Sequence, residues 1–85
     1  MNKERVTVVY ELLKYFLVNK HSSSESIIQS LPFSEHEIRK GLELLKKNEF
    51  VFSYGAEDYY INQNVTYMIS QMIRAHDDLH GKWVI

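Results

Sequence analysis

The fold is decided by residues 22–62, which read SSSESIIQSLPFSEHEIRKGLELLKKNEFVFSYGAEDYYIN. The first half carries two segments with apolar residues at helical spacing, separated by Pro32. Proline cannot continue a helical hydrogen-bond ladder, and it pushes the preceding residue towards an extended conformation. The second half alternates aromatic and smaller residues on both sides of Gly55, which is typical of a β-hairpin. The stretch therefore predicts helix, turn, helix and two short strands.

Serine and glutamate residues three positions apart mark where both helices of this stretch begin. Ser22 with Glu25, and Ser34 with Glu37, have the form of a capping box, in which each side chain bonds to the other residue's backbone amide. The first pair predicts a short helix that ends near residue 31. The second pair predicts a longer helix, whose buried face is formed by Ile38, Leu42 and Leu45.

A hairpin should follow this longer helix. Asn48 stands where the helix should stop, and asparagine tolerates the left-handed backbone that is typical of helix ends. Beyond it, two short strands are expected on either side of Gly55. The turn between them is acidic, because residues 49–58 include Glu57 and Asp58 and contain no lysine or arginine.

Amphipathic helices are also expected on either side of this stretch. Residues 4–18 contain no glycine or proline and carry two neighbouring apolar stripes, so most of the helix circumference is apolar. Such a helix must be covered on more than one side. A last helix begins at Asn62 or Asn64 and can supply this cover, either within one chain or across a dimer. Its apolar stripe consists of Val65, Met68, Ile69, Met72, Ile73, His76 and Leu79.

The composition excludes several classes of protein. With 85 residues, of which 45% are hydrophobic and 25% charged, the chain has the composition of one small folded domain. The absence of cysteine excludes disulfides, thiolate zinc sites and cysteine nucleophiles. No apolar run approaches a membrane span and the N-terminus lacks the pattern of a signal peptide, so we expect no membrane partner and a cytoplasmic location. The net charge of −1 gives no general attraction to nucleic acid, so any such binding must use a local patch.

The helix spacing between Ile27 and Leu45, followed by a tight aromatic hairpin, resembles the winged-helix domains of bacterial and archaeal DNA-binding proteins. The resemblance covers residues 5–62. It implies a mainly α fold with a small β-hairpin (α+β), in which the longer helix of the helix-turn-helix enters the major groove of double-stranded DNA. The residues that it places at the DNA are Ser34, His36, Arg39, Lys40, Lys46 and Lys47, with Lys3 and Arg5 as an N-terminal arm.

The residues in this set have different expected roles. Arg39 and Lys40 would contact guanine edges or phosphates, and Ser34 with the first amides of its helix would take a phosphate. The acidic hairpin departs from the family pattern, because a basic wing tip is replaced by one that repels phosphate. The alternative for this helix surface is an ordinary solvated face whose charges pair with one another.

We therefore expect the whole chain, 1–85, to form one winged-helix domain that acts as a homodimeric transcription regulator on a palindromic site. Residues 5–62 form the core of this domain. Residues 64–82 form a C-terminal helix that dimerises together with the first helix. The expected dimer interface consists of Val8, Leu12, Tyr15, Met68, Ile69, Met72, Ile73, Leu79 and Trp83.

Two other functions stay open. The acidic hairpin and the nearly neutral charge also suit a winged-helix module that binds a protein partner, as an adaptor or anti-regulator. A further alternative is a sensor of apolar ligands that uses the seam around Met68 and Met72. The six tyrosines suggest a stacking platform for single-stranded nucleic acid, but the acidic hairpin lacks the basic groove that this mode needs.

The sequence carries no signature of an enzyme, and we expect no catalysis, metal or cofactor. His76 and His80 lie four residues apart in HDDLH, so both could reach one metal ion. This motif differs from the HExxH of zinc peptidases, because aspartate replaces glutamate and no third ligand is evident. The chain also has no phosphate-binding glycine loop and no nucleophile motif.

Overall fold

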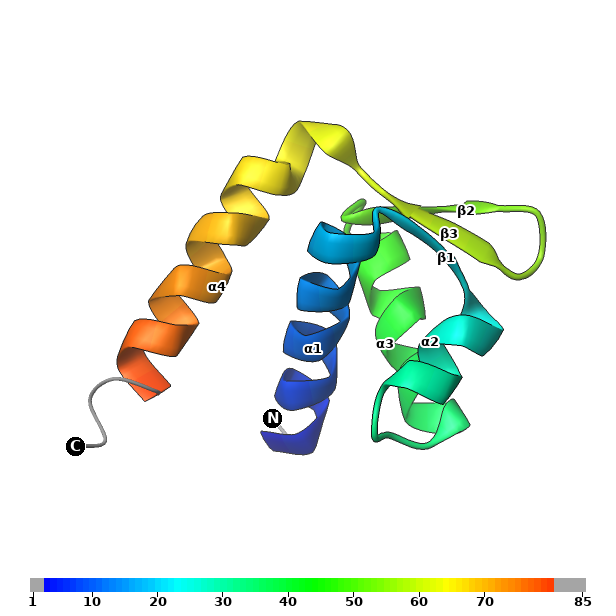
Figure 1. Cartoon of the computed structure of the whole chain (residues 1–85), viewed down its shortest axis with the longest axis horizontal. Coiled ribbons are helices and arrows are strands. Elements are labelled where there is room, and N and C mark those ends of the chain that lie inside the picture. The colour runs from blue at the N-terminus through cyan, green and yellow to red at the C-terminus, as the bar shows by residue number, and fades with distance from the viewer. Residues whose placement is uncertain (1–2, 81–85) are drawn as a thin grey trace.

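The computed structural model describes the backbone of residues 3–80 and the side chains of residues 7–76. It is mainly helical with a small antiparallel sheet, which confirms the α+β class (Figure 1). In chain order the elements are α1 (Lys3–Asn19), β1 (His21–Ser23), α2 (Ser24–Ser30), α3 (Glu35–Lys47), β2 (Val51–Tyr54), β3 (Asp58–Ile61), the 3-10 helix η1 (Gln63–Val65) and α4 (Thr66–His80). Among the expected site residues, Trp83 and the side chains of Lys3, Arg5 and Leu79 lie outside the described part.

The predicted capping box at the start of α3 is confirmed. The hydroxyl oxygen of Ser34 accepts a hydrogen bond from the amide of Glu37 (3.1 Å), and the Glu37 carboxylate accepts one from the amide of Ser34 (3.0 Å). At the other end, Asn48 is the C-cap as expected, but its φ is −93°. The left-handed residue is instead Glu49, with a φ of 62°, and it turns the chain towards β2.

The predicted cap of α2 is wrong by one residue. Ser23, not Ser22, is the N-cap, and its hydroxyl oxygen accepts a hydrogen bond from the amide of Ser26 (3.1 Å). Ser22 belongs to β1, where its buried hydroxyl is hydrogen-bonded to the hydroxyl of Tyr15 (2.8 Å). The pairing of β1 with β3 therefore decides which serine is left to cap the helix.

The sequence does not predict β1, which extends the hairpin to a three-stranded sheet of order β1-β3-β2. Lys20 has a φ of 63° and turns the chain out of α1, and its carbonyl accepts a hydrogen bond from the amide of Ile61 (2.8 Å). The register then places Ser22 opposite Tyr59. Three polar residues offer no apolar alternation, so this strand forms through its pairing with β3 rather than through a local pattern.

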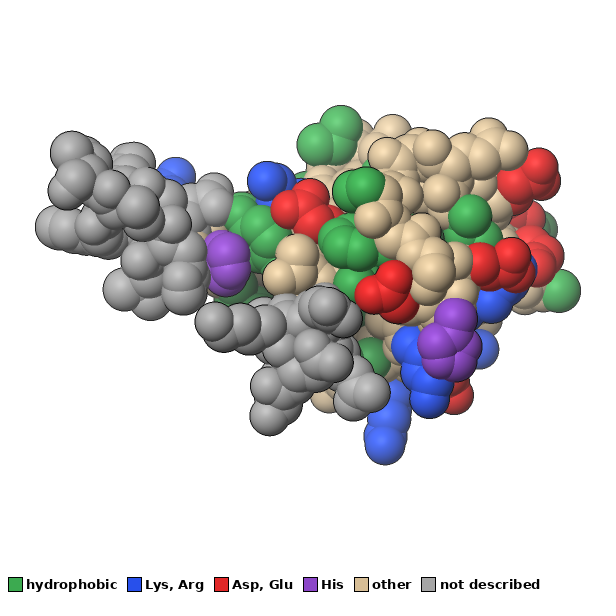
Figure 2. All heavy atoms as spheres, turned by 90° about the horizontal axis from the view of Figure 1, so that it is seen from below, with side chains coloured by type: hydrophobic (Ala, Val, Ile, Leu, Met, Phe, Trp, Pro, Cys, Tyr) green, Lys and Arg blue, Asp and Glu red, His purple; other side chains and the backbone are tan. Residues whose placement is uncertain are grey.

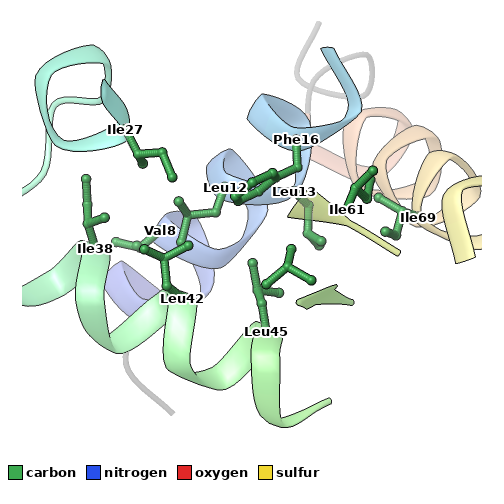
Figure 3. Close-up of a cluster of buried hydrophobic side chains, with 11 residues drawn as sticks. Val8, Leu12, Leu13, Phe16, Ile27, Ile38, Leu42, Leu45, Ile61 and Ile69 are labelled. Carbon is green, nitrogen blue, oxygen red and sulfur yellow. The ribbon is translucent and has the colours of Figure 1, made fainter. Parts of the chain in front are cut away.

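The core is made by one face of each helix and the inner face of the sheet (Figure 3). A glycine controls how closely α1 and α3 approach. A Cβ at Gly41 would lie 2.5 Å from Cδ1 of Leu12 and 3.2 Å from Cγ1 of Val8. The missing side chain at position 41 therefore allows α1 to seat directly on α3. The buried side chains are Val8, Leu12, Leu13, Phe16, Ile27, Ile38, Leu42, Leu45, Val51, Ile61 and Ile69.

The last helix, α4, packs against α1 of its own chain, on the side away from α3 (Figure 1). Ile69 is fully buried in the common core. About two turns further along α4, the rings of Tyr10 and His76 stack with their centroids 3.9 Å apart. The sequence leaves open whether this helix covers α1 in cis or across a dimer, and in the structure it does so in cis.

Candidate nucleic-acid interface

The solvent face of α3 is the surface on which the expected DNA contacts converge. Ile38, Gly41, Leu42 and Leu45 define the buried face of this helix. At 3.6 residues per turn, the opposite face is centred on the exposed residues His36, Lys40, Glu43 and Lys47, with Lys46 beside them. Figure 2 shows blue and red side chains close together on the end of the domain that it views.

The three lysines of α3 are available for binding. Lys40, Lys46 and Lys47 are exposed, and no ion pair holds them within the part of the chain that the structure describes. Lysine is a compact charge on a flexible stem and suits contact with a phosphate rather than with a base edge. The chemistry of these side chains therefore suits phosphates better than base edges.

Arg39, expected at the DNA beside Lys40, is held by two carboxylates instead. Its Nε donates to Glu35 (2.9 Å), and its two terminal nitrogens each face one carboxylate oxygen of Glu57 at 3.4 Å. The hydrogen bond to Glu35, followed by those to Glu57, raises the pKa of Arg39 above its ordinary value. The side chain is partly exposed, but each of its three guanidinium nitrogens already donates one hydrogen bond to a carboxylate of the same chain.

The carboxylate that holds Arg39 stands at the hairpin tip and is itself fixed in place. Glu57 accepts a hydrogen bond from the hydroxyl of the buried Ser24 (2.8 Å), and its backbone carbonyl accepts one from the Ser24 amide (2.7 Å). The Ser24 hydroxyl and then the Arg39 guanidinium lower the pKa of Glu57. The start of α2, the hairpin tip and α3 are therefore joined through one acidic side chain.

The first turn of α3 is less suited to an anion than the sequence predicts. The hydroxyl oxygen of Ser34 already caps the helix by accepting the Glu37 amide. The Ser34 amide, followed by its side chain, lowers the pKa of Glu37, so this carboxylate is ionised at neutral pH. With Glu35 beside it, the first turn already carries negative charge that neutralises the positive end of the helix dipole.

Part of the expected dimer interface is internal to one chain. Val8 and Leu12 face α3 at Gly41, and Ile69 is buried between α4 and the rest of the core. They are fully or nearly fully buried within one chain, so they belong to its core and not to an exposed interface. The physical reason is that the apolar stripe of α1 expected to face a partner is the one that Gly41 allows to seat on α3.

The remaining described residues of that expected interface lie at or near the surface. Tyr15 is half-buried and hydrogen-bonded to Ser22. Ile73 is half-buried against the core. Met68 and Met72 are each 45% exposed and lie one helical turn apart on α4, where they form a continuous apolar strip.

Sequence reasoning missed a second exposed surface, the outer face of the sheet. The register pairs Phe52 of β2 with Tyr60 of β3, and their ring centroids are 5.6 Å apart. Tyr54, which is 71% exposed, lies on the same face two residues along β2, and His21 of β1 stands opposite Tyr60. The alternation of the two strands was visible in the sequence, but its extension onto β1 depended on the unpredicted strand.

The described residues offer no support for a metal site or a membrane span. Among the described side chains, those of residues 7–76, no group of three or more potential metal ligands comes together. His76 stacks on Tyr10 at the α1–α4 contact, and the side chain of His80 lies outside the described part. No helix in the described part is long and apolar enough to cross a bilayer.

No protein-family model, curated protein or solved structure matches the chain. The candidate interface therefore rests on its geometry alone. It consists of three lysines without an ion pair in the described part of the chain, of Arg39 held between two carboxylates, and of an acidic hairpin tip.

Proposed function

We propose that this chain is a small winged-helix regulator that binds double-stranded DNA through the solvent face of α3. The observation that carries the proposal is the set of Lys40, Lys46 and Lys47, which are exposed and unengaged on a helix whose opposite face is locked into the core. A rigid helix with positive charges along its outer face can approach the phosphates that line a major groove.

The order of the elements supports the same proposal. α2 and α3 follow one another across a short turn, and β2 and β3 come next, which is the order of elements that the winged-helix resemblance implies. Pro32 lies in the turn, and the capping box at Ser34 sets the start of α3. The proposed groove-binding helix is therefore positioned by its own cap and by its packing on α1.

The proposed contacts differ from those expected from the sequence. His36, Lys40 and Lys47 lie at the centre of the outer face, and Lys46 lies at its side. They would bind mainly phosphate. Arg39 is excluded as a primary contact in this conformation, because Glu35 and Glu57 occupy its donors.

A fluorescence anisotropy titration against random-sequence duplex DNA tests this proposal. The double variant Lys40→Gln/Lys47→Gln should bind more weakly, and the slope of log K against log salt should fall by about 0.9 for each lysine that contacts a phosphate. Lys14→Gln is the control, because it removes one lysine charge from α1 rather than from α3; Lys14 lies 5.0 Å from the ring of Tyr10. Equal binding by all three proteins would contradict the assigned surface.

We also propose that the regulator is a homodimer that pairs through α4. Met68 and Met72 form an exposed apolar strip beside the helix face that packs on α1. Flexible methionine side chains are common on surfaces that bind apolar partners. A dimer would present two copies of α3 to one DNA site, so its mass in solution should be measured alongside the titration.

A second candidate function is a winged-helix module that binds a protein partner. The exposed aromatic residues Phe52, Tyr54 and Tyr60 on the outer face of the sheet favour it, because aromatic side chains are enriched at the centres of protein interfaces. Salt separates the two functions, since phosphate-driven binding weakens steeply between low and moderate salt and apolar contacts do not. No binding to duplex DNA at low salt would favour the protein-binding module.

A further inference from the structure

The geometry around Arg39 bears on how α3 would bind DNA. A guanidinium reads guanine with two neighbouring N–H groups, which bond to O6 and N7 of the base. In the structure, the end of the guanidinium faces both oxygens of Glu57 at 3.4 Å, and Nε donates to Glu35 at 2.9 Å. Each pair of neighbouring donors therefore has at least one member already in use. Arg39 cannot form the two-bond contact with guanine while this arrangement persists.

The position of Glu57 is fixed by more than its ion pair with Arg39. The Ser24 hydroxyl donates to the carboxylate, and the Ser24 amide donates to the backbone carbonyl of the same residue. Ser24 is itself buried at the start of α2. Two contacts with the start of α2, neither of which involves Arg39, therefore hold the Glu57 carboxylate within reach of Arg39.

We infer that Glu57 withholds Arg39 from DNA, so that the hairpin tip limits the affinity of α3 for duplex DNA. The inference rests on the proposed function. The pair is partly exposed, with side-chain exposures of 44% for Arg39 and 53% for Glu57, and such pairs contribute little to stability. A DNA phosphate can therefore compete with Glu57 for the guanidinium, and the carboxylate opposes that exchange through its own negative charge.

The substitution Glu57→Gln separates the ion pair from the rest of the contact. The amide oxygen of glutamine can still accept the bond from Ser24, whereas the negative charge that holds Arg39 is lost. We expect the variant to bind duplex DNA about three- to fivefold more tightly and its salt slope to rise by about 0.9, because Arg39 becomes free to contact one phosphate. A thermal melt confirms that the variant is folded.

Two controls distinguish a released arginine from a general change in charge. Asp58→Asn removes the same charge from the next residue, which makes no ion pair in the described part of the chain. It should strengthen binding less than Glu57→Gln does. In an Arg39→Gln background, Glu57→Gln should strengthen binding no more than Asp58→Asn, since no arginine remains to be released.

The outcomes separate this inference from the proposed function. If Lys40→Gln/Lys47→Gln weakens binding but Glu57→Gln behaves like Asp58→Asn, the inference is overturned and the DNA-binding function stands. An equal effect of Glu57→Gln with and without Arg39 also overturns the inference. If the unmodified protein does not bind duplex DNA at low salt, both fall.

Discussion

The first helix has two helical neighbours, and it contacts them in different ways. Against α3 it packs closely at Gly41, where the missing side chain leaves room for Leu12 and Val8. Against α4 it packs through the buried Ile69 and the stacked rings of Tyr10 and His76. The buried face of α3 is covered by α1 together with α2 and β2, whereas α4 leaves Met68 and Met72 each 45% exposed. Thus α1, α3 and the sheet form the tight unit, and α4 is the element with surface left for a partner.

Truncation on the α3 side should have the largest effect on stability. Leu12→Ala removes a fully buried side chain, and the facing residue Gly41 has no side chain that could relax into the cavity. We expect a loss of about 4 kcal/mol in the free energy of unfolding, near the upper end for such substitutions. Chemical denaturation measures it, with Val18→Ala, an 80% exposed site on the same helix, as a control of about 0.5 kcal/mol or less.

The equivalent truncation on the α4 side should cost less. Ile69→Ala also empties a fully buried site, but α4 can shift towards α1 because it is packed on one side only. We expect a loss of about 2 to 3 kcal/mol. Hydrogen exchange should then speed up in α4 before it does in α3. Equal acceleration in both helices would show that the two contacts form a single cooperative unit.

The sequence predicted those parts of the fold that local patterns determine. Apolar periodicity located the helices, and the Ser34 capping box located the start of α3. The sequence did not predict β1, because this polar strand forms only through its pairing with β3. For the same reason it did not predict the true cap of α2, since Ser22 lies in β1 and Ser23 is left as the cap. The sequence identified the exposed lysines of the candidate site. It did not predict that Arg39 would pair with Glu57, which lies 18 residues further along the chain. Contacts of that range depend on the folded hairpin and leave no local signal.

Substitution of the exposed strip on α4 should affect association more than folding. Met68→Ser/Met72→Ser alters two side chains that are each 45% exposed, so the free energy of unfolding of one chain should change by about 1 kcal/mol or less. If the chain is a dimer through α4, sedimentation should show a weaker dimer. Tyr67→Ser is the control, since Tyr67 is 76% exposed on another side of the helix. An unchanged dimer would place the self-association surface elsewhere.

The smallest expected effect is on the pH dependence of stability, through the carboxylates of Glu37 and Glu57. The pKa values of Glu37 and Glu57 are lowered in the folded chain, by the amide of Ser34 and by the hydroxyl of Ser24, respectively. Their contributions to stability are therefore present above the ordinary glutamate pKa of 4.5 and are lost as the pH falls through the lower folded-state values. Thermal melts should show a decline in Tm below about pH 4.5 that is shallower in Glu37→Gln. A decline that is the same in both proteins would contradict this role of Glu37.

The ends of the strands determine how far copies of the protein can pair edge to edge through their sheets. The two edges of the sheet are β1, with three residues, and β2, with four. Left-handed residues bound both strands, with Lys20 before β1 and Glu49 and Gly55 on either side of β2, and α2 begins directly after β1. Neither edge can offer another chain a long, straight row of free backbone groups. The same turns that shape the hairpin therefore protect this aromatic sheet from growing into an aggregate.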